Sequence, residues 1–152
     1  MARKLRIECA GAIYHVMNRG ERQEPIFEDE SDRERFLETL REACLKTDCQ
    51  VHAYCLMSNH FHLVLPGAGN TPGQSGGWNA VVPQHLTPRG STGGIGGSAT
   101  LCSGCYKWLI VDGGGTGYLR TVCEYVHLNP VRAKLLTPEQ PLRDYRWSSF
   151  GE

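Results

Sequence analysis

Four short segments of the chain have the hydrophobic pattern of β-strands. Residues 11–18 fit the two-residue period of a strand, which places Ile13, His15 and Met17 on one face. The other three segments are mostly apolar runs bounded by turn residues. We therefore predict strands at residues 11–18, 50–57, 60–65 and 106–111.

Two longer segments have helical periodicity. Apolar side chains recur at helical spacing across residues 32–47, and Ser31 followed by Glu34 forms a capping-box pattern at the start. Residues 116–128 carry a second apolar stripe, which Pro130 ends. The order of these elements favours an α+β fold, specifically a ferredoxin-like antiparallel sheet with helices on one face.

The composition of the chain changes abruptly in its middle. The 152 residues suit one domain, which we place at residues 1–150. Within it, residues 66–104 contain Arg89 as their single charged residue and hold 11 of the 18 glycines. A structureless loop of that length is unusual inside a compact domain, so we treat this glycine-rich segment as aberrant.

Charge and cysteine content bear on partners and compartment. Lys+Arg and Asp+Glu are 16 each, and this neutrality at face value argues against a partner with a phosphate backbone. Seven cysteines without a secretory signal indicate reduced thiols and a cytoplasmic location. The longest apolar run, residues 61–65, is too short to cross a bilayer, so no membrane is expected as a partner.

Two histidines stand two positions apart in the third predicted strand. His60 and His62 project from the same strand face, because successive side chains point to opposite faces. Neutral imidazole is a common metal ligand, so the pair forms half of a candidate metal site. The alternative is a pair of surface or hydrogen-bonded histidines with no ligand.

A tyrosine and an asparagine share one face of the last predicted helix. Tyr125 and Asn129 are four residues apart, the spacing that brings side chains together on a helix. A tyrosine oxygen can act as a covalent nucleophile, and an asparagine oxygen can bind a hard cation. Equally, Tyr125 can be a partly buried aromatic residue, and Asn129 can simply end the helix before Pro130.

Three blocks of sequence together resemble a known family, the REP-associated tyrosine transposases, which belong to the HUH single-strand DNA transposases. The blocks are Gly-Ala-Ile-Tyr-His-Val-Met-Asn-Arg-Gly near the N-terminus, His-Ala-Tyr-Cys-Leu-Met-Ser-Asn-His-Phe-His-Leu in the centre, and Tyr-Val-His-Leu-Asn-Pro-Val-Arg-Ala, followed by Trp-Ser-Ser, near the C-terminus. The resemblance covers residues 1–65 and 105–150.

The resemblance implies a metal-dependent single-stranded DNA endonuclease and strand transferase. His60, His62 and Asn129 would bind Mg²⁺ or Mn²⁺, and Tyr125 would form a 5′-phosphotyrosine intermediate beside REP-like hairpins. Two scissions per event imply a homodimer, with a monomer left open. Four basic residues are candidate phosphate contacts, although each is equally a solvated surface charge: Arg19, Arg22, Arg132 and Lys134.

Shifted reading frames change the interpretation of residues 66–104. We wrote the possible codons for residues 87–94 and read them one base earlier. In that frame they permit Tyr-Thr-Ala-Arg-Phe-Asn-Arg-Arg, which resembles the amino-acid sequence that members of the family have in this region. The codons of residues 98–101, read with the same shift, also permit a sequence similar to the family's. The codons of residues 74–84 do so when they are shifted in the opposite direction. We hypothesise an out-of-frame translation; a genuine glycine-rich insertion is the alternative.

Two other functions stay open at this stage. A chain with a damaged middle segment can be an inactive transposase remnant. Alternatively, Cys102 and Cys105 form a CxxC pair, which would fit a non-catalytic nucleic-acid-binding module that holds zinc. The CxxC pair lacks the second ligand pair that a structural zinc site needs.

Overall fold

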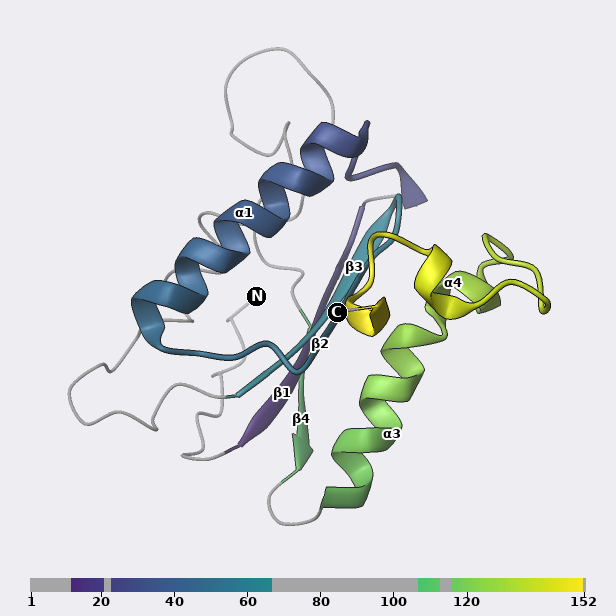
Figure 1. Cartoon of the computed structure of the whole chain (residues 1–152). Coiled ribbons are helices and arrows are strands. Elements are labelled where there is room, and N and C mark those ends of the chain that lie inside the picture. The colour runs from purple at the N-terminus through teal and green to yellow at the C-terminus, as the bar shows by residue number, and fades with distance from the viewer. Residues whose placement is uncertain (1–11, 21–22, 67–106, 113–115, 152) are drawn as a thin grey trace, which may run out of the picture.

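The computed structural model describes residues 12–20, 23–66, 107–112 and 116–151 (Figure 1). Within these ranges the chain forms one four-stranded sheet with helices packed against it. The strands are β1 (Ile13–Arg19), β2 (Ala53–Leu56), β3 (His60–Pro66) and β4 (Lys107–Asp112). The helices are α1 (Glu30–Thr47), α3 (Thr116–His127) and the short α4 (Asn129–Arg132), with 3-10 turns η2 (Leu142–Asp144) and η3 (Ser149–Gly151).

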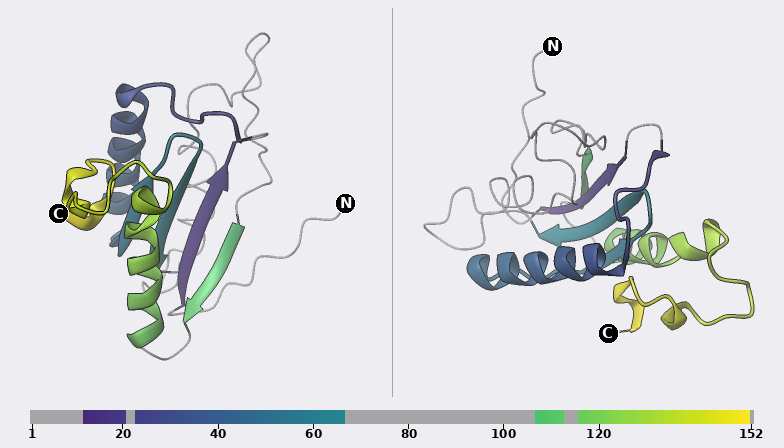
Figure 2. Two further views of the ribbon diagram at one scale, coloured as in Figure 1. Left: turned by 90° about the vertical axis from the view of Figure 1, so that its right-hand side faces the viewer. Right: turned by 90° about the horizontal axis from the view of Figure 1, so that it is seen from above.

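The sheet has the strand order β2-β3-β1-β4, and all three strand pairs are antiparallel. β1 therefore lies inside the sheet, and β4 forms one edge beside it, as the left view of Figure 2 shows. This order places the first strand between the third and fourth, as the ferredoxin-like fold requires. The predicted α+β class and antiparallel sheet are confirmed.

The two long helices cover opposite faces of the sheet, which corrects the expectation that the helices share one face. On one face, Phe61 and Leu63 of β3 pack with Phe36 and Leu40 of α1. Because neighbouring strand residues point in opposite directions, this contact leaves the other face of β3 free for a different helix.

That second face carries α3. Val64 of β3 and Cys55 of β2 pack in one buried cluster with Val126 of α3. Figure 1 accordingly shows α1 on one side of the sheet and α3 on the other. Consistent with this, successive residues of β2 and β3 are buried, so both faces of these two strands are covered.

The N-cap of helix α1 lies two residues before the predicted one. Asp29 is the N-cap, and its side chain accepts a hydrogen bond from the backbone nitrogen of Asp32 at 2.8 Å. Asp32 in turn accepts from the backbone nitrogen of Glu28 at 3.0 Å. The pattern that predicted Ser31 as the cap was therefore misplaced, because Asp caps a helix as well as Ser does.

The C-terminal segment lies against β2. The backbone nitrogen of Leu56 donates to the carbonyl of Trp147 at 2.8 Å, and the Tyr145 hydroxyl donates to the carbonyl of Leu56 at 2.8 Å. The Ser149 hydroxyl accepts from the backbone nitrogen of Tyr54 at 2.9 Å. These contacts satisfy the backbone groups that β2 would otherwise expose at the sheet edge.

The aberrant segment, residues 66–104, lies outside the described residues except for its first residue, and Cys102 and Cys105 also lie outside them. The frameshift hypothesis therefore stays a prediction. None of the helices that the structure describes has both the length and the apolar character needed to cross a membrane.

Candidate functional site

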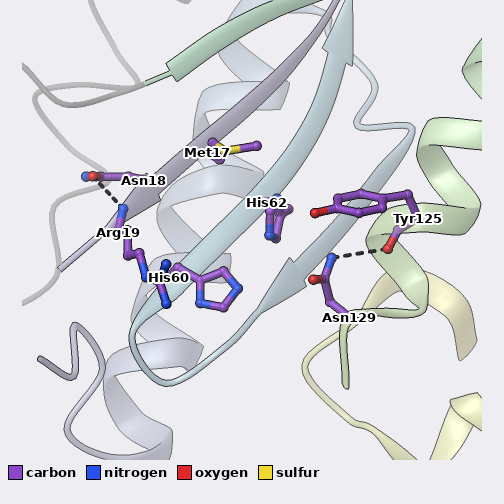
Figure 3. A pocket seen from close by; sticks show the side chains of 7 residues that line it. All are labelled: Met17, Asn18, Arg19, His60, His62, Tyr125 and Asn129. Carbon is purple, nitrogen blue, oxygen red and sulfur yellow. Dashed lines mark hydrogen bonds between the residues drawn. The ribbon is translucent and has the colours of Figure 1, made fainter. Parts of the chain in front are cut away.

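A cavity of about 360 Å³ lies where β1 and β3 meet the end of α3 and the start of α4. Its lining residues are Met17, Asn18, Arg19, His60, His62, Tyr125 and Asn129 (Figure 3). The resemblance described above predicts His60, His62 and Asn129 as metal ligands and Tyr125 as the nucleophile. All four line this one cavity.

A turn before β3 sets the orientation of His60. The Asn59 side-chain nitrogen donates to the carbonyl of Gln23 at 3.3 Å, and the backbone nitrogen of Gly20 donates to the carbonyl of Asn59 at 2.9 Å. The Asn59 amide oxygen therefore faces Nδ1 of His60, 2.6 Å away. Because an amide oxygen only accepts, Nδ1 of His60 is the donor, and Nε2 keeps a lone pair.

His62 lies deeper than His60 and contacts a third histidine. Nδ1 of His62 is 2.9 Å from Nε2 of His15, and both side chains are buried. The two rings stack with their centroids 5.1 Å apart. The contact follows from strand register, because Met17 pairs with His62 and His15 is two residues along the same face of β1.

Burial holds the cavity histidines in the neutral form. Desolvation is the main cause that lowers the pKa of His62 to about 3, with the neighbouring charges of His15 and His60 adding to it. Desolvation also lowers the pKa of His60, helped by the nearby Arg19, and it lowers the pKa of His15. Neutral imidazole is the form that binds metal ions.

Tyr125 stands at the mouth of the cavity. Its ring lies edge-on to that of His62, with centroids 5.9 Å apart, and its side chain is 40% exposed. The Arg132 guanidinium lies 4.9 Å from the centre of the Tyr125 ring, a cation–π contact. The phenol is therefore both accessible from solvent and close to a positive charge.

The nitrogen and the oxygen of the Asn129 carboxamide face different parts of the protein. Its side-chain nitrogen donates to the carbonyls of Tyr125 and Val126, at 3.1 and 3.3 Å, and so caps the end of α3. The carboxamide oxygen consequently turns toward the space that the His60 and His62 rings face (Figure 3). Asn129 therefore does end the helix, through its side-chain nitrogen. The oxygen of the same side chain is left available to bind an ion.

The four basic residues nominated as DNA contacts differ in their placement. Arg19 lines the cavity, and Arg132 lies against Tyr125. Lys134 is exposed in a left-handed backbone conformation with φ of 58° and is not part of the cavity lining. Arg22 lies outside the described residues.

His15 has no role that the sequence predicts. The two-residue period placed it on a strand face, but a period does not say which strand lies alongside or in which register. The signal in the sequence is that His15 shares a strand face with Met17. The structure adds that Met17 pairs with His62 of β3.

The described residues thus define a small α+β protein with a ferredoxin-like sheet and a cavity of two neutral histidines, a tyrosine and an asparagine. Residues 9–71 match the model of the family described as "Transposase IS200 like". Over this segment the chain is similar to the IS200-like transposase family.

A solved structure has a similar fold. That structure is described as a REP-associated tyrosine transposase bound to a REP hairpin, and it matches this chain with a TM-score of 0.67 and 13% sequence identity. The match covers 99% of this chain and 84% of that chain, so the shared fold extends well beyond residues 9–71. No curated protein sequence matches the chain.

Proposed function

We propose that this protein is a metal-dependent endonuclease and strand transferase for single-stranded DNA, with Tyr125 as its nucleophile. The observation that carries the proposal is the meeting of His60, His62, Tyr125 and Asn129 at one cavity, although Tyr125 is far from the histidines in sequence. The similarity of residues 9–71 to the IS200-like transposase family supports the same reaction class.

In the proposed reaction, the Tyr125 oxygen attacks the phosphorus of a phosphodiester and gives up its phenolic proton. The bond from phosphorus to the 3′ oxygen breaks, and that oxygen takes up a proton to become a free 3′-OH. The 5′ phosphate stays on Tyr125 as a phosphotyrosine ester. A 3′-OH from another strand can attack this ester in the reverse sense, which rejoins DNA without ATP.

The residues at the cavity fit a divalent ion such as Mn²⁺ or Mg²⁺. They offer two neutral imidazole nitrogens and one amide oxygen, a donor set of mixed hardness. Among the described residues, no group of three or more His, Cys, Asp or Glu side chains has an arrangement that could hold a metal ion, and the proposed site accordingly includes the Asn129 oxygen. When bound, a divalent ion polarises a phosphate oxygen as a Lewis acid.

The basic residues near the cavity are proposed as phosphate contacts. Arg19 lines the cavity and Arg132 lies over Tyr125, so both stand where a scissile phosphate would enter. Lys134 and Arg22 are proposed for flanking phosphates. The solved structure with the same fold is bound to a REP hairpin, which supports hairpin-flanked DNA as the substrate. We propose a homodimer as the working form, with a monomer as the alternative.

A covalent-adduct assay tests the proposal. The protein is incubated with Mn²⁺ and a single-stranded oligonucleotide that carries a hairpin, and the products are separated on a denaturing gel. We expect a slowly migrating protein–DNA adduct that is lost in Tyr125→Phe. Tyr118→Phe is the matched control, because Tyr118 lies on the same helix and is 59% exposed.

The outcomes separate the three functions. A folded wild-type protein that forms no adduct contradicts the proposal and favours an inactive remnant. Stoichiometric zinc that is lost on Cys102→Ala would instead favour a non-catalytic zinc-binding module.

A further inference from the structure

We propose that His15 is a positioning residue that holds His62 in the one tautomer able to bind a metal ion. The inference rests on the proposed function, because it concerns the metal site assigned there to His60, His62 and Asn129. It adds to that site a residue from β1, a strand that the ligand motif itself does not include.

The contact between the two rings decides what His15 can do. Nε2 of His15 lies 2.9 Å from Nδ1 of His62, which is a hydrogen bond between two buried side chains. The two nitrogens of an imidazole point away from each other. A nitrogen of His15 that faces Nδ1 of His62 therefore does not also face the ion that Nε2 of His62 would hold, so His15 is not an extra ligand.

One proton lies between the two rings, and its position matters. If Nδ1 of His62 carries it, Nε2 of His62 keeps a lone pair for the metal. If Nε2 of His15 carries it, Nδ1 of His62 is the acceptor and the remaining proton of His62 blocks Nε2. Only the first arrangement produces a ligand, so His15 must accept.

His60 shows the same arrangement with a different partner. Its Nδ1 faces the Asn59 amide oxygen at 2.6 Å, and that oxygen can only accept. Each histidine of the motif therefore has an acceptor at Nδ1, supplied by a neighbouring turn for His60 and by β1 for His62. Metal-binding histidines commonly donate their second N–H in this way, which fixes ring orientation and tautomer.

Two variants of His15 separate hydrogen bonding from packing. Gln and Met have similar length and volume, but only Gln carries an oxygen that can replace Nε2 of His15 as the acceptor. We measure Mn²⁺ affinity without DNA, by the electron paramagnetic resonance signal of free Mn²⁺. We expect His15→Met to weaken binding by about 10- to 100-fold and His15→Gln to stay close to wild type.

A second measurement needs no variant. The ring ¹⁵N chemical shifts of His62 in the metal-free wild-type protein report which nitrogen carries the proton. We expect protonated Nδ1 and unprotonated Nε2, with the same pattern in His15→Gln and its loss in His15→Met. Far-UV circular dichroism confirms that each variant is folded.

These measurements distinguish a failure of this inference from a failure of the proposed function. The inference is overturned if wild-type His62 is protonated at Nε2, if wild type binds no Mn²⁺, or if His15→Gln and His15→Met have equal affinities. Mn²⁺ binding that depends on His15 in a protein that forms no DNA adduct refutes the proposed cleavage and supports this inference. An adduct with unchanged Mn²⁺ affinity in His15→Met does the reverse.

Discussion

At the scale of single residues, the cavity combines groups that other parts of the protein hold in place. His62 is buried among His15, His60 and the Tyr125 ring, and desolvation is the largest cause of its low pKa. The same burial that makes His62 a neutral ligand disfavours its protonated form, so acid works against the folded state.

This burial predicts a specific dependence of stability on pH. The pKa of His62 is about 3 in the folded protein and near 6.5 when unfolded, so the unfolded state binds more protons between these values. The contribution of His62 is fully present above pH 6.5 and is lost as pH falls toward 3. Between pH 7 and pH 5 we expect a loss of about 2 kcal/mol from this residue.

Urea unfolding of the metal-free protein at the two pH values measures this loss. The variant His62→Gln should lose correspondingly less stability between pH 7 and pH 5 than wild type. His52→Gln is the control, because His52 is exposed, and it should behave as wild type. An equal loss in wild type and His62→Gln would rule out His62 as the source.

At the scale of elements, helix ends position the site as much as helix faces do. The end of α3 is capped by the Asn129 side chain, and this contact turns the same residue toward the cavity. His127, in the last turn of α3, has Nε2 within 2.9 Å of the Ser149 hydroxyl. The C-terminal segment thus ties the helix that carries Tyr125 to the edge of the sheet at Tyr54.

The start of α1 offers a direct test of the corrected helix boundary. Asp29→Ala removes the side chain that caps the helix, so it should lower the free energy of unfolding by about 1 kcal/mol. Ser31→Ala, two residues later on the exposed surface, should change it much less. Urea denaturation of both variants measures the difference, and Asp29→Asn should restore most of the loss. A larger effect at Ser31 would return the cap to the position predicted from sequence.

At the scale of the whole molecule, the neutral net charge and the aberrant segment belong together. Residues 66–104 contribute a single charged residue, while the rest of the chain carries the other 31. The family match ends at residue 71, shortly after this segment begins. Under the frameshift hypothesis, the amino-acid sequence in the original frame would contain additional arginines and make the protein more basic. Positive charge favours binding to the phosphates of DNA.

Sequencing the gene tests this hypothesis. Relative to close relatives, we expect an insertion or deletion near each end of residues 66–104 and a further one between residues 84 and 87, because the two stretches need opposite shifts. Translation in the corrected frame should replace this glycine-rich stretch with an amino-acid sequence that contains additional arginines. In-frame codons that align with relatives without a gap would establish a genuine insertion instead.

Much of the fold could be predicted from sequence, because strand and helix periods are local properties. The four strands and two long helices were located to within a few residues, as β1 and α3 show. The helix cap at Asp29 was missed because a second acceptable cap, Ser31, lies two residues away. The arrangement of helices on both faces could not be predicted from helix periods, because a period marks the apolar side of a helix but not the sheet face that it covers.

For the site, the sequence by itself determined that His60 and His62 share a strand face and that Tyr125 and Asn129 lie within one helical turn of each other. Only the tertiary structure decided that α3 covers that particular face and that His15 lies against His62. The reason is that periodicity acts within one segment, whereas strand register and the choice of face depend on packing between segments distant in the chain.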